Sequence, residues 1–95
     1  MLDAHQLNVF LVAAESLNFT KPAQHLHMTQ PSVSQHIQSL EKHFGSDLFV
    51  RKGRHIELTE AGRTLMPLAR EMVGMSNTIE DSMESIKGLL IGRLS

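Results

Sequence analysis

Residues 20–62 read TKPAQHLHMTQPSVSQHIQSLEKHFGSDLFVRKGRHIELTEAG, and this stretch decides the fold. Near its middle, Thr29 is a suitable N-cap and Pro31 falls in a first helical turn, where its missing N–H costs least. Gly45 stands where a left-handed residue usually ends a helix. The apolar residues between these signals recur at helical spacing and are expected to face inward; they are Val33, Ile37, Leu40 and Phe44. The pattern predicts a helix over residues 30–44.

Two helices are predicted before this one. Thr20 is a possible N-cap for a short helix that ends near residue 27, with Pro22 close to its start. Residues 4–17, AHQLNVFLVAAESL, predict a first helix that Asp3 could cap. Its apolar stripe consists of Leu7, Phe10, Leu11 and Ala14. The short second helix is joined by a tight turn to the helix over residues 30–44, which is the arrangement of a helix-turn-helix.

A β-hairpin is predicted after these helices. The runs LFV at 48–50 and IEL at 56–58 are compatible with short strands, and they flank Lys52, Gly53, Arg54 and His55. Arg51, Lys52 and Arg54 make the tip a local basic patch, although the net charge of the chain is −1. The sequence therefore predicts a small two-stranded wing with a positive tip.

A long helix is predicted over residues 59–91. Seven of the eight a/d positions of a heptad pattern along this helix are apolar, and the eighth is occupied by Ser82. Such a long, narrow seam requires a partner helix, so we expect a dimer interface made of Leu65, Leu68, Met72, Met75, Ile79, Ile86 and Leu89. Pro67 predicts a bend, and Gly88 and Gly92 predict fraying or a hinge near the end.

Composition limits the classes of function. Ninety-five residues form one small domain that is too small for a deep catalytic cleft, and its acids are scattered, so an enzyme is not expected. The absence of cysteine excludes disulfides, thiol nucleophiles and CxxC zinc sites. No apolar run approaches the roughly 20 residues of a membrane span, and no signal pattern opens the chain, so we expect a cytoplasmic protein without membrane contact.

The outward face of the 30–44 helix suits DNA. With the apolar set turned inward, Pro31, Gln35, Gln38 and Lys42 lie on the opposite side, with Ser34 beside them. Glutamine can pair with adenine N6 and N7, serine can donate or accept, and proline can touch the thymine methyl group. Hydroxyl and cationic side chains suit phosphates. The residues expected at the DNA backbone or on the wing are Thr20, Lys21, Thr29, Gln38, Lys42, Arg51, Lys52 and Arg54.

The motifs QPSVSQHIQSLE, GSDLFVR and LTEAG, in this order, resemble the N-terminal part of LysR-type transcriptional regulators, over essentially all 95 residues. The resemblance implies a mainly α fold: a winged helix-turn-helix over residues 1–58, a dimerising linker helix over 59–91, and the start of a hinge at 92–95. It implies base reading by Gln30, Pro31, Ser32, Ser34 and Gln35 in the major groove of double-stranded DNA, on an inverted-repeat operator. It further implies a homodimer, tetramers of the full-length protein, and a small-molecule inducer bound by a downstream domain that is absent from these residues.

Two positions depart from the family pattern. Gln35 replaces a frequent arginine, which predicts a shift from guanine toward A·T edges, and Pro22 replaces a usual alanine, which predicts a shorter second helix. The six histidines lack an HxxxH pair, so no metal site or other cofactor is expected in this part of the protein. A protein-interaction module is the alternative function, because some winged helices bind protein and the heptad seam suits an adaptor.

Overall fold

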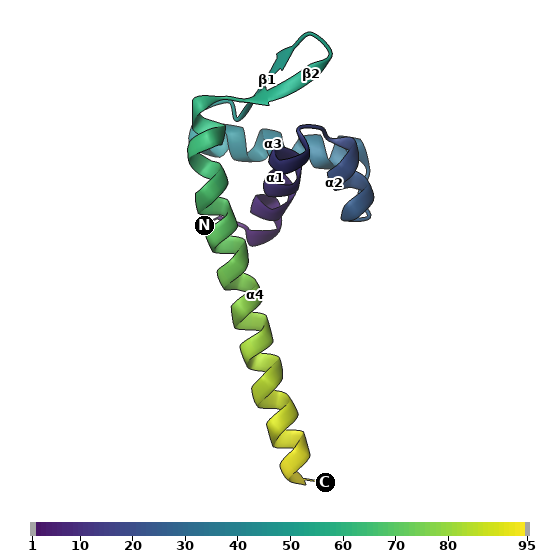
Figure 1. Cartoon of the computed structure of the whole chain (residues 1–95), viewed down its shortest axis with the longest axis vertical. Helices are drawn as coiled ribbons and strands as arrows, with labels where there is room; N and C mark the ends of the chain where they lie inside the picture. Colours follow the sequence, from purple (N-terminus) through teal and green to yellow (C-terminus); the bar gives the residue numbers. More distant parts are fainter. Residues whose placement is uncertain (1, 95) are drawn as a thin grey trace.

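The computed structural model describes residues 2–94, with side chains described for residues 2–89. It contains four helices and one antiparallel hairpin: α1 (Ala4–Ser16), α2 (Thr20–His25), α3 (Gln30–Phe44), β1 (Phe49–Lys52), β2 (His55–Leu58) and α4 (Glu60–Leu94). Figure 1 shows α1, α2 and α3 gathered at one end of α4, with the hairpin projecting beyond them and most of α4 extending away. The molecule measures 60 × 24 × 19 Å.

The helix boundaries follow from local hydrogen bonds, most of which were predicted. The Asp3 side chain accepts from the His5 amide at 2.8 Å, and Thr29 Oγ1 accepts from the Ser32 amide at 3.2 Å. Gly45 has φ +67 and donates its amide hydrogen to the Glu41 carbonyl. These three caps confirm the expected ends of α1 and α3.

The expected N-cap at Thr20 is wrong. Thr20 is the first helical residue of α2, and the preceding residue, Phe19, provides no side-chain cap. Asn18 caps the helix instead, because its side-chain oxygen reaches the Lys21 amide at 2.7 Å. The helix ends at His25 after six residues, so it is short, as Pro22 suggested. The Thr20 hydroxyl is thereby left outside the capping interaction.

The core is built around α1. Its buried residues meet those of α3, with Leu48 before the wing and Ala69 of α4 completing the cluster. The fully enclosed side chains include Leu7, Phe10, Val33 and Leu40. Phe44 was expected inward, but it is 40% exposed, because it lies in the last turn of α3 at the edge of this core.

The wing is anchored by Phe49. Its ring lies 5.6 Å from that of Phe10 in α1 and 5.5 Å from that of Phe19 just before α2, measured between centroids. The register pairs Arg51 with Ile56 and Lys52 with His55. Aromatic contacts of this kind add stability beyond the area they bury. They hold the base of the hairpin against the helices while its tip projects freely (Figure 1).

The start of α4 is joined to the segment that precedes the wing. Thr59 donates its hydroxyl hydrogen to the Asp47 carbonyl and accepts from the Gly62 amide at 3.1 Å. Its own amide donates to the Leu48 carbonyl at 3.0 Å. The helix continues through Pro67 to Leu94, beyond the expected end at residue 91. Residue 95, the last of the expected hinge, lies outside the described residues.

Candidate nucleic-acid interface

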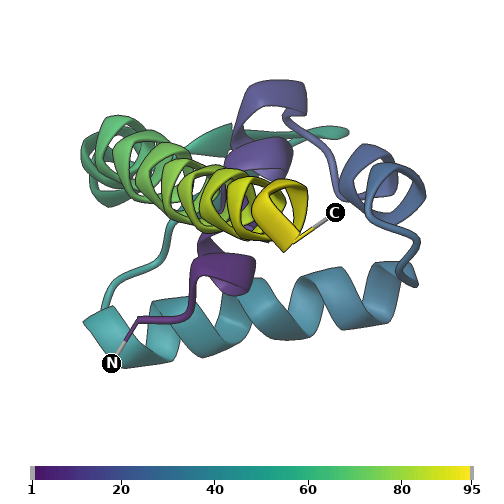
Figure 2. The ribbon, with the colours of Figure 1, turned by 90° about the horizontal axis from the view of Figure 1, so that it is seen from below.

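No other helix or strand within residues 2–94 covers the outer face of α3. Figure 2, viewed along α4, shows α3 at the edge of the molecule with no other element outside it. Val33, Ile37 and Leu40 are buried on the inner side. The exposed residues on the other side are Gln30, Pro31, Gln35, Gln38 and Lys42, and Ser32 and Ser34 are half-buried beside them. The structure therefore gathers the residues expected to read bases along the first turns of one exposed helix.

The wing lies beside the exposed face of α3. A hollow of about 240 Å³ separates α3 from the hairpin, with Ser34, Gln38 and Glu41 on the helix side and Val50 and Arg51 on the wing side. The Glu41 carboxylate accepts from the Leu48 amide at 2.8 Å, which ties α3 to the start of the wing. This connection fixes the distance between the polar helix face and the basic hairpin.

A second hollow, of about 250 Å³, lies between the starts of α2 and α3 and the wing. Its polar lining consists of Asn18, Thr20, Gln30, Arg51, Arg54 and His55. Gln30 Nε2 donates to Thr20 Oγ1 at 3.1 Å across the junction of the two helices. Hydroxyl and guanidinium donors around one concave surface are the groups that bind phosphate oxygens.

The cations expected at the DNA backbone are all solvent-exposed. Lys21 lies on α2, Lys42 on α3, and Arg51, Lys52 and Arg54 on the wing. Gly53 between the wing cations has φ +64, the left-handed conformation that glycine adopts without strain. Thr29 differs from these residues because its oxygen already caps α3, which leaves only its hydroxyl hydrogen for a phosphate.

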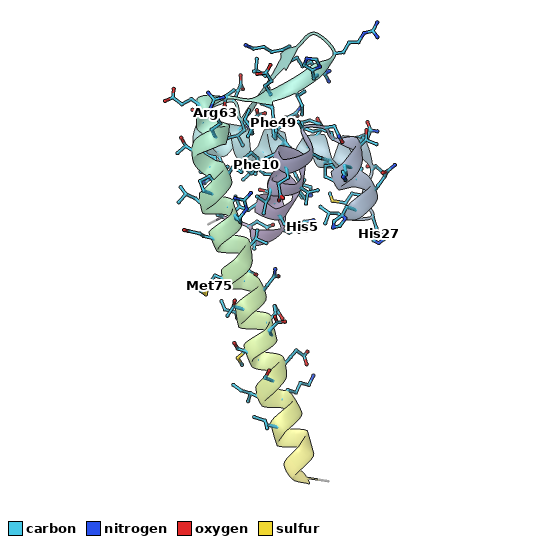
Figure 3. The ribbon with its side chains drawn as sticks, in the orientation of Figure 1. His5, Phe10, His27, Phe49, Arg63 and Met75 are labelled. Atoms are coloured by element: carbon cyan, nitrogen blue, oxygen red, sulfur yellow. The ribbon has the colours of Figure 1, made fainter. Side chains whose placement is uncertain are left out.

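The outer part of α4 carries an exposed apolar stripe. Figure 3 shows Met75 projecting from the side of α4 opposite α1 and α2. The stripe consists of Leu68, Met72, Met75, Ile79, Met83, Ile86 and Leu89, each between 38% and 69% exposed. Leu65, expected in the same interface, is half-buried and packs against the core of its own chain.

Met83 is the residue that the heptad pattern missed. From Leu68 to Ile86 the stripe advances in steps of four, three, four, four and three residues, which keeps it on one face of a straight helix with 3.6 residues per turn. A strict heptad would place Ser82 there and would require the helix to supercoil. A search for apolar residues at the 3.6-residue period of a straight helix would have identified Met83 as part of the stripe.

The histidine and acidic side chains are scattered in the part of the chain that the structure describes. No group of three or more histidine, aspartate or glutamate side chains there could hold a metal ion. The rings of His5 and His36 lie 5.3 Å apart and nearly perpendicular, as a packing contact. None of its helices is apolar over a length that would cross a membrane.

Three helices around one core, with a polar outer face on the third and a basic hairpin beside it, define a winged helix-turn-helix protein. Residues 4–63 match the model of the bacterial regulatory helix-turn-helix protein, lysR family. The chain belongs to this family and carries its DNA-binding domain. It is therefore a regulator domain and not an enzyme.

Relatives support the same assignment. The chain is 38% identical over 94 residues to the transcriptional regulator IlvR of Caulobacter vibrioides, covering 99% of the chain and 32% of IlvR. It is 37% identical over 94 residues to an uncharacterized regulator of Azotobacter vinelandii, covering 99% of the chain and 65% of that protein. The chain thus spans between about a third and two thirds of the length of these relatives.

Solved structures include DNA complexes. The CbnR DNA-binding domain in complex with DNA has a TM-score of 0.79 and 32% identity, over 90% of this chain and 98% of that one. The BenM DNA-binding domain with its catB site 1 DNA has a TM-score of 0.82 and 27% identity, over 90% of this chain and 96% of that one. These similarities confirm the winged helix-turn-helix with its long following helix.

Proposed function

We propose that the chain reads double-stranded operator DNA by inserting the first turns of α3 into the major groove, within a transcription regulator of the bacterial cytoplasm. The single observation that supports this most directly is the exposed polar face of α3, on the side opposite the buried Val33, Ile37 and Leu40. Side-chain amides, hydroxyls and a proline at the start of an uncovered helix match the edges of bases in that groove.

In this proposal one set of residues reads the bases and another set binds the DNA backbone. Base edges are read by Gln30, Pro31, Ser32, Ser34 and Gln35. The DNA backbone is bound by Thr20, Lys21, Thr29, Gln38 and Lys42, and the wing adds Arg51, Lys52 and Arg54 at the backbone or in the minor groove. Phosphate contacts hold the register, whereas the base contacts supply sequence preference.

We further propose that two copies pair through the apolar stripe of α4. Seven exposed apolar side chains on one helix face, from Leu68 to Leu89, favour association because their burial removes them from water. A symmetric dimer presents two copies of α3, so the operator is an interrupted inverted repeat. Full-length relatives are longer, and in the whole protein we expect an inducer-binding domain that follows α4, with tetramers as a further assembly state.

The salt dependence of binding tests the proposal. Each copy offers five exposed cations to the backbone, namely Lys21, Lys42, Arg51, Lys52 and Arg54. The two copies of a dimer together offer up to ten phosphate contacts, which release counterions, so affinity for a mixed-sequence duplex should fall by about 10³-fold or more between 50 and 200 mM salt. A gel-shift titration measures this, and a random-pool selection then identifies the operator. Absence of salt-dependent binding would instead favour a protein-interaction module.

A further inference from the structure

The hydrogen bond between Thr20 and Gln30 joins a residue expected at the DNA backbone to one expected at the bases. Thr20 is the first residue of α2, and Gln30 is the first residue of α3. Gln30 Nε2 donates to Thr20 Oγ1 at 3.1 Å, and both side chains are solvent-exposed. The orientation of the Gln30 amide is therefore set by a neighbouring hydroxyl before any DNA is bound.

Among the described residues, the Thr20 hydroxyl makes no hydrogen bond other than the one to Gln30. A threonine at the start of a helix usually caps it, but here the Asn18 side chain performs that function by accepting from the Lys21 amide at 2.7 Å. The hydroxyl oxygen accepts from Gln30, so its hydrogen remains free to donate. Removing the hydroxyl leaves the cap of α2 intact, which separates its role in binding from a role in folding.

The free hydrogen lies beside a site suited to phosphate. Thr20 and Gln30 line the same hollow of about 250 Å³ as Arg51, Arg54 and His55 of the wing. A phosphate oxygen held there by the guanidinium groups can also accept from the Thr20 hydroxyl. The hydroxyl can thus bind phosphate and glutamine together, because it has one donor and two acceptor positions.

We propose that Thr20 is a positioning residue that fixes the base preference of Gln30, and this rests on the proposed DNA-binding function. Glutamine carries two N–H donors and one carbonyl acceptor. With one N–H committed to Thr20, Gln30 retains one donor and its acceptor. An adenine edge requires one donor for N7 and one acceptor for N6. Gln30 is therefore held in the state that pairs with adenine, and a phosphate bound to Thr20 reinforces that state.

The experiment compares Thr20→Val, which removes the hydroxyl at nearly constant shape, with Thr20→Ser, which retains it. Operator sequences are selected from a random pool with the 95-residue chain and each variant. Gln30→Ala identifies the base pair that Gln30 reads, as the position whose preference it abolishes. At that position Thr20→Val should lower the preference for adenine by roughly five-fold or more, the lower end of what a bidentate contact provides. Thr20→Ser should keep the preference of the parent chain.

The outcomes distinguish this proposal from the function on which it rests. If the parent chain selects no sequence, the proposed function fails. If it selects an operator and Thr20→Val weakens binding to all sequences equally while adenine stays preferred, Thr20 is only a phosphate ligand and the positioning role is overturned. Loss of preference in both Thr20→Val and Thr20→Ser also overturns it, because the serine hydroxyl should hold Gln30. Equal melting temperatures for the three proteins confirm that folding is unaffected.

Discussion

Gly62 lies against Leu48 so closely that a Cβ at position 62 would overlap the Leu48 carbonyl oxygen and approach the Leu58 side chain to 2.8 Å. That carbonyl also accepts from the Thr59 amide, so it cannot move away without breaking a hydrogen bond. The first turn of α4 is therefore packed against the segment leading into the wing at a position where only glycine fits.

Replacing Gly62 by alanine should lower the free energy of unfolding by about 1–3 kcal/mol, the usual cost of overpacking. Gly74 provides the matched control, because nothing lies within 4 Å of a Cβ there and it occupies the interior of the same helix. Gly74→Ala should raise stability by about 0.4–1 kcal/mol. Thermal or urea unfolding of both variants measures the difference, and equal effects of the same sign would contradict the proposed packing.

Ile79→Asp should dissociate the dimer. Ile79 is 56% exposed in the single chain and lies within the apolar stripe, so in the dimer its replacement would bury an unpaired charge. Asn77→Asp is the control, because Asn77 lies on the opposite side of α4 and is exposed. Sedimentation at tens of micromolar should find a monomer for Ile79→Asp and a dimer for Asn77→Asp. A parent chain that is already monomeric would refute the interface.

Met83 should contribute more to dimerisation than Ser82. The apolar stripe follows the straight-helix period and includes Met83, whereas a heptad seam would use Ser82. Met83→Ala should raise the dimer dissociation constant by about thirty-fold, on the basis of roughly 2 kcal/mol for a truncated methionine. Ser82→Ala should leave it nearly unchanged. Concentration-dependent sedimentation decides between the two seams.

Arg51→Ala and Arg54→Ala should each weaken binding to all sequences by similar factors. Both cations flank the exposed hairpin tip and both line the hollow beside Thr20, where a phosphate is expected. Loss of one phosphate contact in each copy should reduce the slope of log affinity against log salt by about 0.9 for every copy bound, which is about 1.8 for the dimer. Arg70→Ala, which removes an exposed arginine from α4, should leave the slope unchanged. A changed operator preference would instead indicate that the wing reads bases in the minor groove.

Gln35→Ala should flatten preference at one symmetric base-pair position and leave non-specific binding nearly intact. Gln35 is exposed on the outer face of α3, one turn from its start. A bidentate glutamine–adenine pair is worth about 1–3 kcal/mol of discrimination. Gln35→Arg should move the preference toward guanine. Selected sites for the parent chain and both variants provide the measurement, and identical preferences in all three would assign the readout to DNA shape.

The order and type of every element could be predicted from the sequence, because caps, prolines and apolar spacing act locally. Thr29, Asp3 and Gly45 all perform the expected capping functions. Side chains at the edges of elements could not be placed in the same way. Phe44 continues the apolar period of α3 but lies beyond the core, and Leu65 continues the period of α4 but packs inward. Their burial depends on where neighbouring helices end.

The functional face was predictable to a similar extent. The periodicity of α3 correctly placed Pro31, Gln35, Gln38 and Lys42 on its exposed side. The bond between Thr20 and Gln30 could not be foreseen, because it depends on the angle between α2 and α3. Because Asn18 caps α2, the Thr20 hydroxyl is available for another partner. No local sequence pattern indicates that Asn18 rather than Thr20 is the cap.

The unbroken path of α4 has a mechanical consequence. The helix is bound to the base of the wing through Thr59, packs on the core through Ala69, and carries the apolar stripe further along the same axis. With 35 residues it is about 52 Å long at 1.5 Å per residue. In the proposed dimer it would act as a lever arm: a small rotation between the two paired α4 helices would produce a large displacement of each α3 and change the spacing between the half-sites that the two copies reach.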